Sequence, residues 1–256
     1  MSQNEVPPLL HTQPIPERDR FPTTLSQFAA IPQNIADRNR RFHPEPPTAT
    51  PADLFAVAKN KCSLPGYRFI RKTDRERSQA LFFVDGSCLD NGAGPDAPRE
   101  PRGGSAVVFS PEAWYKPIKH ALELDGERHT SNRAELRAAI IALGLRFWTG
   151  EGFDNIIIAT DSEYMVQGIC ERIHKWRGNG WRTSTGAAVK NRVLWEALLA
   201  KLREFEQNGC HVQFWLIPRA WNEADKYAKE AAATPDEERG TSGITESVMM
   251  IERMPE

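Results

Sequence analysis

The stretch from Ser131 to Asp161 constrains the fold of this chain more than any other part of the sequence. Its first half carries apolar residues at helical spacing, which predicts an amphipathic helix: Leu136, Ala139, Ile140, Leu143 and Phe147. After a turn that contains glycine, a short run rich in β-branched residues at 155–160 predicts a buried strand. Glu135 is therefore expected in the first turn of a helix, and Asp161 is expected where a strand ends.

Similar patterns on both sides of this stretch predict a sheet covered by helices. Three apolar runs separated by turns predict consecutive antiparallel strands at 80–84, 103–110 and 114–124. Downstream, one more strand is expected at 211–217, among helices at 162–176, 189–208 and 222–233. Right-handed crossovers would make the later strands parallel to the first. We therefore expect an α/β fold with a mixed five-stranded sheet, three antiparallel strands plus two parallel strands, flanked by helices.

The two ends of the chain differ in composition from this ordered part. Residues 1–78 are expected to form a disordered or loosely structured, proline-rich arm, with a short helix at 52–60. The domain is then expected at 79–234 and a polar tail at 235–256. Five arginines of the arm could tether nucleic acid, although interspersed acids are typical of a solvated linker: Arg18, Arg20, Arg38, Arg40 and Arg41.

Charge and cysteine content narrow the class of protein only slightly. The formal net charge is −1 at pH 7, so only the distribution of charge can indicate nucleic acid. The four cysteines are scattered, with no C-x-x-C pair and no histidine at zinc spacing, which argues against structural zinc and disulfides. No apolar run approaches the ~20 residues of a membrane helix, and the N-terminus does not resemble a secretory signal. We expect an intracellular protein, cytoplasmic or nuclear, without membrane contact.

Four acids fall at the ends of predicted elements. Asp85 closes the first strand, Glu135 opens a helix, Asp161 closes the fourth strand and Asp225 lies in the first turn of the last helix. Parallel strands would bring Asp85 and Asp161 to the same edge of the sheet. Carboxylates crowded together repel one another unless a cation lies between them, and all-oxygen ligands favour Mg²⁺ or Mn²⁺. Two such ions would suit phosphodiester hydrolysis, because one activates water while the other stabilises the leaving oxygen.

Each acid also has a simpler explanation when it is taken alone. Asp85 could be a turn residue, and Glu135 could complete a capping box with Asn132. Asp161 could cap the following helix, and Asp225 could complement a helix dipole. Because all four explanations must hold together, the combined pattern favours a metal site.

A second cluster combines positive charge with aromatic rings. Residues 171–192 contain six arginines and lysines against the single acid Glu171, with Trp176 and Trp181 among them. Cations neutralise phosphates and flat rings pack on sugars or bases, so this segment predicts a nucleic-acid contact. The alternative is that the tryptophans belong to the core and the charges to a solvated face.

Four segments together resemble the type 1 ribonuclease H family, in the order in which that family carries them. They are Asp-Gly-Ser-Cys-Leu at 85–89, Thr-Ser-Asn-Arg-Ala-Glu-Leu-Arg-Ala-Ala-Ile at 130–140, Thr-Asp-Ser-Glu-Tyr-Met-Val-Gln-Gly-Ile at 160–169 and Trp-Arg-Gly-Asn-Gly-Trp-Arg at 176–182. The resemblance extends from about Ala80 to Ala233. It implies a ribonuclease H-like fold and cleavage of the RNA strand of RNA–DNA hybrids, with two Mg²⁺ ions or Mn²⁺ as a substitute. The products would carry 3′-hydroxyl and 5′-phosphate ends.

The resemblance also implies roles for individual residues. Asp85, Glu135, Asp161 and Asp225 match the metal-binding carboxylates. Hybrid contacts are implied at eleven further positions: Cys88, Asn91, Arg128, Thr130, Asn132, Lys175, Trp176, Arg177, Trp181, Arg182 and Asn191. The small N-terminal hybrid-binding domain that some relatives possess has no match here, and we expect a monomer.

Two departures from the family pattern leave alternatives open. The segment 217–225 is short and lacks the histidine that the family carries before its last aspartate, although Arg219 could replace it in part. The loop at 90–102 is longer than usual. A catalytically weakened or inactive hybrid-binding module of the same fold therefore remains an alternative, and so does a nuclease of this fold that acts on DNA.

Overall fold

The computed structural model describes residues 40–63, 65–91 and 100–240, and all of these belong to the unit that spans residues 32–256. The arginines at positions 18, 20 and 38 and the tail from residue 241 lie outside the described residues, as does the segment 92–99 of the long loop. None of the helices in the described ranges combines the length and the apolar character that crossing a membrane requires.

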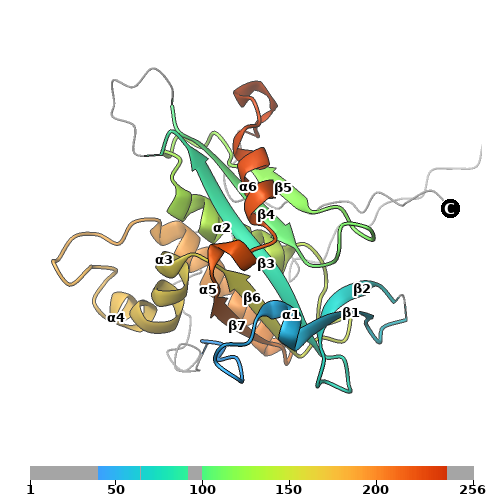
Figure 1. Cartoon of the computed structure of the whole chain (residues 1–256). Helices are drawn as coiled ribbons and strands as arrows, with labels where there is room; N and C mark the ends of the chain where they lie inside the picture. The colour runs from blue at the N-terminus through green and yellow to red at the C-terminus, as the bar shows by residue number, and fades with distance from the viewer. Residues whose placement is uncertain (1–39, 64, 92–99, 241–256) are drawn as a thin grey trace, which may run out of the picture. The chain divides into compact units, whose positions relative to one another are not determined.

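A seven-stranded mixed sheet forms the centre of the described chain (Figure 1). Its longest strand, β3 (Gln79–Leu89), pairs antiparallel with β4 (Arg102–Val108), which pairs with β5 (Ile118–Ala121). On its other edge β3 runs parallel to β6 (Asn155–Thr160), and β6 runs parallel to β7 (His211–Leu216). The predicted sheet of three antiparallel and two parallel strands is therefore confirmed, although the predicted strand at 114–124 shortens to β5.

Two further strands precede this sheet and correct the expectation of an irregular segment before residue 79. The predicted helix at 52–60 is only α1 (Pro51–Leu54), which is followed by β1 (Phe55–Lys59) and β2 (Tyr67–Arg71). These strands form an antiparallel pair, and Phe69 and Ile70 of β2 pair with β3. They form because Phe55 and Phe69 supply the apolar side chains that the open face of β3 needs.

Residues 40–42 also join the sheet, along the outer edge of β7. The amide of Phe42 donates to the carbonyl of Phe214 at 2.9 Å, and the amide of Phe214 donates to the carbonyl of Arg40 at 2.7 Å. The buried Arg40 guanidinium pairs with Glu206 at 2.6 Å. Part of the predicted arm therefore covers a sheet edge that would otherwise be unpaired.

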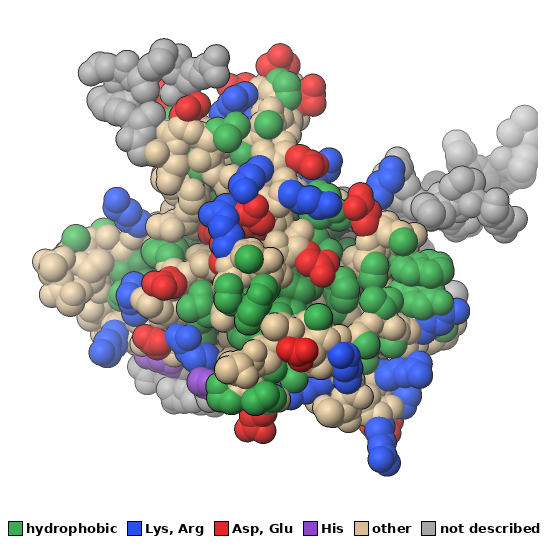
Figure 2. Space-filling view, in the orientation of Figure 1, with side chains coloured by type: hydrophobic (Ala, Val, Ile, Leu, Met, Phe, Trp, Pro, Cys, Tyr) green, Lys and Arg blue, Asp and Glu red, His purple; other side chains and the backbone are tan. Residues whose placement is uncertain are grey.

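Helices cover both faces of the sheet. Figure 1 shows α6 (Asp225–Ala232) crossing in front of β3 and β4, with α2 (Ser131–Gly144) behind them. Helix α5 (Arg192–Gln207) packs against α2 and β7. Between β6 and α5 lie α3 (Glu163–Gln167), a π-helical turn at Gly168–Arg172 and α4 (Ile173–Gly178). Figure 2 shows lysine, arginine and acidic side chains gathered over α6 on the front face.

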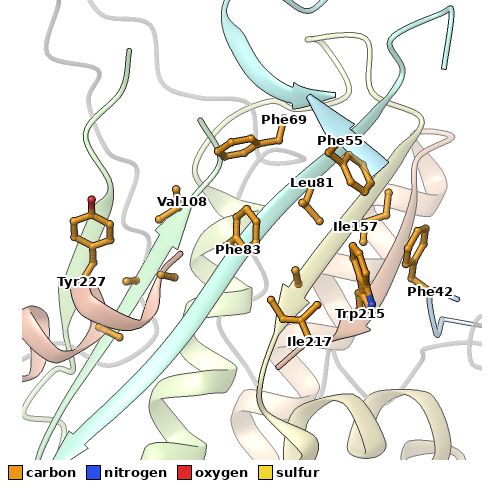
Figure 3. Close-up of a cluster of buried hydrophobic side chains, with 14 residues drawn as sticks. Phe42, Phe55, Phe69, Leu81, Phe83, Val108, Ile157, Trp215, Ile217 and Tyr227 are labelled. Atoms are coloured by element: carbon orange, nitrogen blue, oxygen red, sulfur yellow. The ribbon is translucent and has the colours of Figure 1, made fainter. Parts of the chain in front are cut away.

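The core follows the two-residue period of the strands. Leu81 and Phe83 of β3 face a cluster that includes Phe55, Phe69 and Trp215 (Figure 3). Phe82 points to the opposite face, where its ring lies 4.5 Å from that of Trp148. The central strands are buried on both faces, which explains why they are continuous apolar runs in the sequence. This double burial fixes β3, which carries Asp85, and β6, which ends just before Asp161.

Candidate active site

Asp85 lies inside β3 and not at its end. Its backbone pairs with Ala106 of β4, so its interpretation as a turn residue is wrong. The parallel partner β6 stops at Thr160, and the register that joins Phe83 to Ala159 would place Asp161 beside Asp85. The Asp85 side chain is only 1% exposed, and its Oδ2 has no hydrogen-bond partner among the described residues. A buried carboxylate oxygen without a protein partner is compatible with a cation bound at this point.

Glu135 approaches Asp85 because α2 lies very close to β3. A Cβ atom on Gly86 would fall 2.1 Å from the backbone nitrogen of Glu135, so only glycine permits this approach. Helix α2 begins after Thr130, whose hydroxyl accepts a hydrogen bond from the amide of Arg133. Glu135 therefore lies in the second turn, not the first, and it does not form the capping box considered from the sequence. Its carboxylate accepts a 3.5 Å hydrogen bond from the Thr160 hydroxyl.

Asp161 follows the last residue of β6 and is held by an asparagine from the segment before α6. The Asn222 side-chain amide donates to Asp161 Oδ1 at 2.7 Å and to the carbonyl of Val84 at 3.0 Å. The N-cap of α3 is Ser162, whose hydroxyl accepts from the amide of Met165, so Asp161 does not cap this helix. Asn222 thus ties Asp161 to the strand that carries Asp85.

The carboxylates of Asp85, Glu135 and Asp161 converge, with one oxygen of each within 4.8 Å of the others. Burial, with the charges of Asp161 and Asp225, raises the pKa of Asp85 to about 7. Burial and the charges of Asp85 and Asp161 also raise the pKa of Glu135 well above its ordinary value. Both shifts come first from burial and second from the charges of the neighbouring carboxylates. Three oxygen ligands suit a hard divalent ion such as Mg²⁺, so the residues present fit the expected metal.

Asp225, the fourth predicted ligand, does not belong to this group of three. It lies in the first turn of α6, as predicted, and its negative charge acts on Asp85. Both oxygens lie beside cations: Arg219 forms an ion pair at Oδ1, although Oδ1 has no hydrogen-bond partner among the described residues, and Lys229 donates to Oδ2 at 2.5 Å. Burial raises the pKa of Asp225, but the hydrogen bonds from Lys229 and Arg219 outweigh burial and lower it.

Several predicted hybrid-contact residues lie around the start of α2 and the end of β3. Thr130 is the N-cap of α2, while Arg128 and Asn132 beside it are exposed. Cys88 is half-buried near the end of β3, and Asn91 is exposed just beyond it. The structure thus brings these five residues to the two elements that carry Asp85 and Glu135.

The basic and aromatic segment divides into buried and exposed parts. Trp176 is a core residue, because it is only 8% exposed and its ring lies 5.5 Å from that of Trp195. The core alternative left open by the sequence therefore holds for Trp176. Trp181 is half-buried, with the guanidinium of Arg192 5.5 Å from its ring centroid. Lys175 and Arg182 are exposed and Arg177 is half-buried.

Asn191 precedes α5 in a left-handed backbone conformation with φ of 58°. Its side-chain amide donates to the hydroxyl of Tyr164 at 3.4 Å, and Trp195 Nε1 donates to the same hydroxyl at 3.2 Å.

The site residue that sequence reasoning missed is Asn222, together with the pairing of Lys229 to Asp225. The spacing of four residues between Asp225 and Lys229 could have indicated this ion pair.

Comparisons with known proteins match this chain to one family. A model of the RNase H family matches residues 77–233. The ribonuclease H of Actinobacillus succinogenes is 37% identical over 159 residues, which cover 62% of this chain and 93% of that protein. The ribonuclease HI of Vibrio parahaemolyticus is 34% identical over 157 residues, which cover 61% and 92%.

The solved structures matched to this chain include LC9-RNase H1, described as a type 1 RNase H with the type 2 active-site motif. It is 27% identical, with a TM-score of 0.44, and the match covers 60% of this chain and 72% of that one. The RNase H1 of the archaeon Halobacterium salinarum is 23% identical, with a TM-score of 0.37 over 60% and 96% of the two chains.

Proposed function

This chain belongs to the ribonuclease H family and is a ribonuclease H, and we propose that it hydrolyses the RNA strand of RNA–DNA hybrids by two-metal-ion catalysis. Family membership implies dependence on a divalent metal. We propose Mg²⁺ as that metal, with Mn²⁺ as a substitute, and products with 3′-hydroxyl and 5′-phosphate ends. The nucleophile would be water, because no serine or cysteine of the chain is placed for this role by the family pattern.

The observation that carries this proposal is the convergence of Asp85, Glu135 and Asp161 within 4.8 Å. The buried Oδ2 of Asp85, which has no hydrogen-bond partner in the described part of the chain, supports a cation at this point. When bound there, divalent ions supply two things that this reaction needs: water activated at neutral pH and charge stabilisation at the leaving oxygen.

The residues of the chain would bind and orient the reacting groups. Asp85, Glu135 and Asp161 would hold the metal, and Asn222 would keep Asp161 in place through its 2.7 Å hydrogen bond. Asp225 on α6, whose negative charge acts on Asp85, would complete the ligand set. Rigid elements on both sides of these acids, β3 and α2, would limit their movement during turnover.

We propose that the hybrid lies across the start of α2 and the α4 region. Exposed Arg128, Lys175 and Arg182 would neutralise backbone phosphates, whereas Thr130 and Asn132 would supply hydrogen bonds. Selectivity for RNA would come from contacts to 2′-hydroxyls across the minor groove. Trp181, with its ring partly accessible, would pack on a sugar or base. In this proposal the protein acts as a monomer.

We also propose an intracellular location, cytoplasmic or nuclear. All four cysteines are free thiols in the structure, which is compatible with a reducing compartment. Fractionation of cells followed by detection of the chain would test this location, and recovery of the protein outside cells would contradict it.

One observation favours a second candidate, a hybrid-binding module with weak or no catalysis. The segment 217–225 has no histidine, and Arg219 there pairs with Asp225. Binding of a hybrid without cleavage in either Mg²⁺ or Mn²⁺ would support this candidate over the active enzyme.

The test compares cleavage of a labelled hybrid in Mg²⁺ by the wild-type protein with cleavage by Asp85→Asn and Asp161→Asn. Both variants should lose cleavage while they keep the wild-type far-ultraviolet circular dichroism. Glu163→Gln is the matched control, because Glu163 is an exposed acid two residues from Asp161 and should leave cleavage unchanged. Undiminished cleavage by Asp85→Asn or Asp161→Asn would refute the metal assignment.

A further inference from the structure

The antiparallel pair β1–β2 carries an aromatic surface that is open to solvent. Tyr67 of β2 stacks on Trp114, from the loop between β4 and β5, with ring centroids 4.0 Å apart and an angle of 25° between the ring planes. Trp114 is nevertheless 50% exposed, so much of its ring is uncovered. A stacked pair of rings that is partly open to solvent can accept a further flat ring on its free side.

Positive charge lies beside this stacked pair. Lys59 of β1 is paired with Tyr67 of β2, so the two side chains share one face, and the Lys59 Nζ lies 5.3 Å from the centre of the Tyr67 ring. Lys116, two positions after Trp114, is also exposed. Figure 2 shows apolar side chains with lysine and arginine side chains beside them at this end of the front face. We call Lys59, Tyr67, Trp114 and Lys116 the aromatic surface.

The sequence around β1 and β2 is basic as well. Residues 55–78 hold seven lysines and arginines against two acids. Two of the seven are compensated by acids, because buried Arg68 pairs with Glu151 and Lys61 pairs with Glu76. Lys59, on the aromatic surface, has a ring as its neighbour and forms no ion pair within the described ranges. Positive charge is therefore left over for a ligand.

The nearest acid of the loop does not cancel this charge. Glu112, two positions before Trp114, accepts a hydrogen bond from the Tyr227 hydroxyl at 2.6 Å and lies 3.9 Å from the Lys226 Nζ. Its charge is thus directed toward α6, which carries both of these residues.

The combination of an open aromatic ring and lysines fits a single-stranded nucleic acid. Unpaired bases stack on aromatic side chains while lysines neutralise the phosphates that connect the bases. The bases of a duplex are already stacked on one another, so a ring on the protein surface cannot reach their faces. A protein partner fits less well, because lysine is depleted in protein–protein interfaces.

We propose that the aromatic surface is a second nucleic-acid site, which binds a single strand independently of the active site. The strands β1 and β2 precede residue 77, where the match to the RNase H family begins. Figure 1 shows them on the other side of the sheet from α3 and α4. The site therefore goes beyond the proposed function: it holds an unpaired strand, whereas the acids act on the hybrid.

Fluorescence anisotropy of a labelled oligodeoxythymidine of about 12 nucleotides, with the full-length protein in EDTA, tests this site. Trp114→Ala should weaken binding on the order of tenfold, because the stacking of one base is lost. Trp114→Phe should keep most of the affinity, because it keeps a flat ring on Tyr67. Phe147→Ala is the matched control: Phe147 is 74% exposed but lies outside the aromatic surface, so binding should equal that of wild type.

The salt dependence of binding separates charge from stacking. Lys59→Gln should reduce the slope of log affinity against log salt by about 0.7, the value for one phosphate of a single strand. Trp114→Ala should leave this slope unchanged. If Trp114→Ala also lowers the unfolding midpoint, the exposed Lys59→Gln decides, and an unchanged slope in that variant overturns the site.

Other outcomes assign the surface differently. Equal affinities of wild type and Trp114→Ala, or no binding by wild type, would overturn the proposal. A wild-type dimer in sedimentation that Trp114→Ala makes monomeric, with unchanged oligonucleotide affinity, would assign the surface to a second copy of the chain. The binding assay contains no metal, so its result does not depend on cleavage. Trp114→Ala should still cleave a blunt hybrid in Mg²⁺ as wild type does, and absence of cleavage by both would remove only the proposed function.

Discussion

Without metal, the protein should lose stability as the pH rises from 4 to 8, and Asp85 should cause much of the loss. Burial, with the charges of Asp161 and Asp225, raises the pKa of the folded Asp85 from its ordinary value of 3.8 to about 7. Between these values the folded chain keeps a proton that the unfolded chain has released. The free energy of unfolding therefore falls with pH across this window and levels off above it.

The loss of stability that Asp85 causes follows from the difference between its pKa in the folded and in the unfolded chain. About three pKa units at 1.36 kcal/mol each correspond to about 4 kcal/mol for Asp85 at full effect. The raised pKa of Glu135 acts in the same direction. Glu123 acts in the opposite direction, because the hydrogen bond and charge of Arg137 outweigh its burial and lower its pKa. The comparison of wild type with Asp85→Asn isolates the contribution of Asp85.

Urea unfolding followed by circular dichroism in EDTA, at pH 5, 6, 7 and 8, measures this contribution. Asp85→Asn should be more stable than wild type at pH 8, by up to about 4 kcal/mol, and the advantage should shrink toward pH 5. Mg²⁺ added to wild type at pH 8 should restore stability, because it binds only the folded site. Glu163→Gln should follow the wild-type curve. Parallel pH profiles for wild type and Asp85→Asn would refute the reasoning.

Three further changes test how the site is built. Gly86→Ala should destabilise the protein in urea by on the order of 3 kcal/mol and impair cleavage, because the new Cβ would lie 2.1 Å from the backbone of Glu135. An unfolding midpoint equal to that of wild type would contradict this. Arg239→Ala should cost about 3 kcal/mol, since the buried guanidinium donates to four backbone carbonyls; thermal unfolding within 1–2 °C of wild type would argue against it. Lys175→Ala should leave the unfolding midpoint unchanged but reduce the slope of log hybrid affinity against log salt by about one, and an unchanged slope would remove Lys175 from the interface.

The approach of Asp161 to Asp85 could be predicted from the sequence because it depends on the order of the strands. A continuous apolar run at 80–84 and another at 155–160 indicate two strands buried on both faces, and parallel neighbours end at the same edge. The exact position of Asp85 could not be predicted in this way. Its strand continues past Asp85 because β4 supplies a partner, and no local pattern marks that pairing.

Contacts between distant segments account for the parts that sequence reasoning missed. Strands β1 and β2 are short and partly exposed, so the alternation of apolar and polar residues in their sequences is weak. They form because β2 can pair with β3. Trp176 sits among cations in the sequence, yet it packs on Trp195, nineteen positions away. The pairing of Asp225 with Arg219 likewise depends on how one turn places a side chain, which composition and spacing do not determine.

A Mg²⁺ titration of cleavage tests the central claim that Asp85, Glu135 and Asp161 form the metal site of a hybrid-specific ribonuclease. The same labelled RNA strand is offered in an RNA–DNA hybrid and in duplex RNA, and a duplex DNA of matched sequence is the third substrate. Cleavage should rise with Mg²⁺ on the hybrid alone and should be absent in EDTA. Metal-independent cleavage, or equal cleavage of duplex RNA or duplex DNA, would contradict the account.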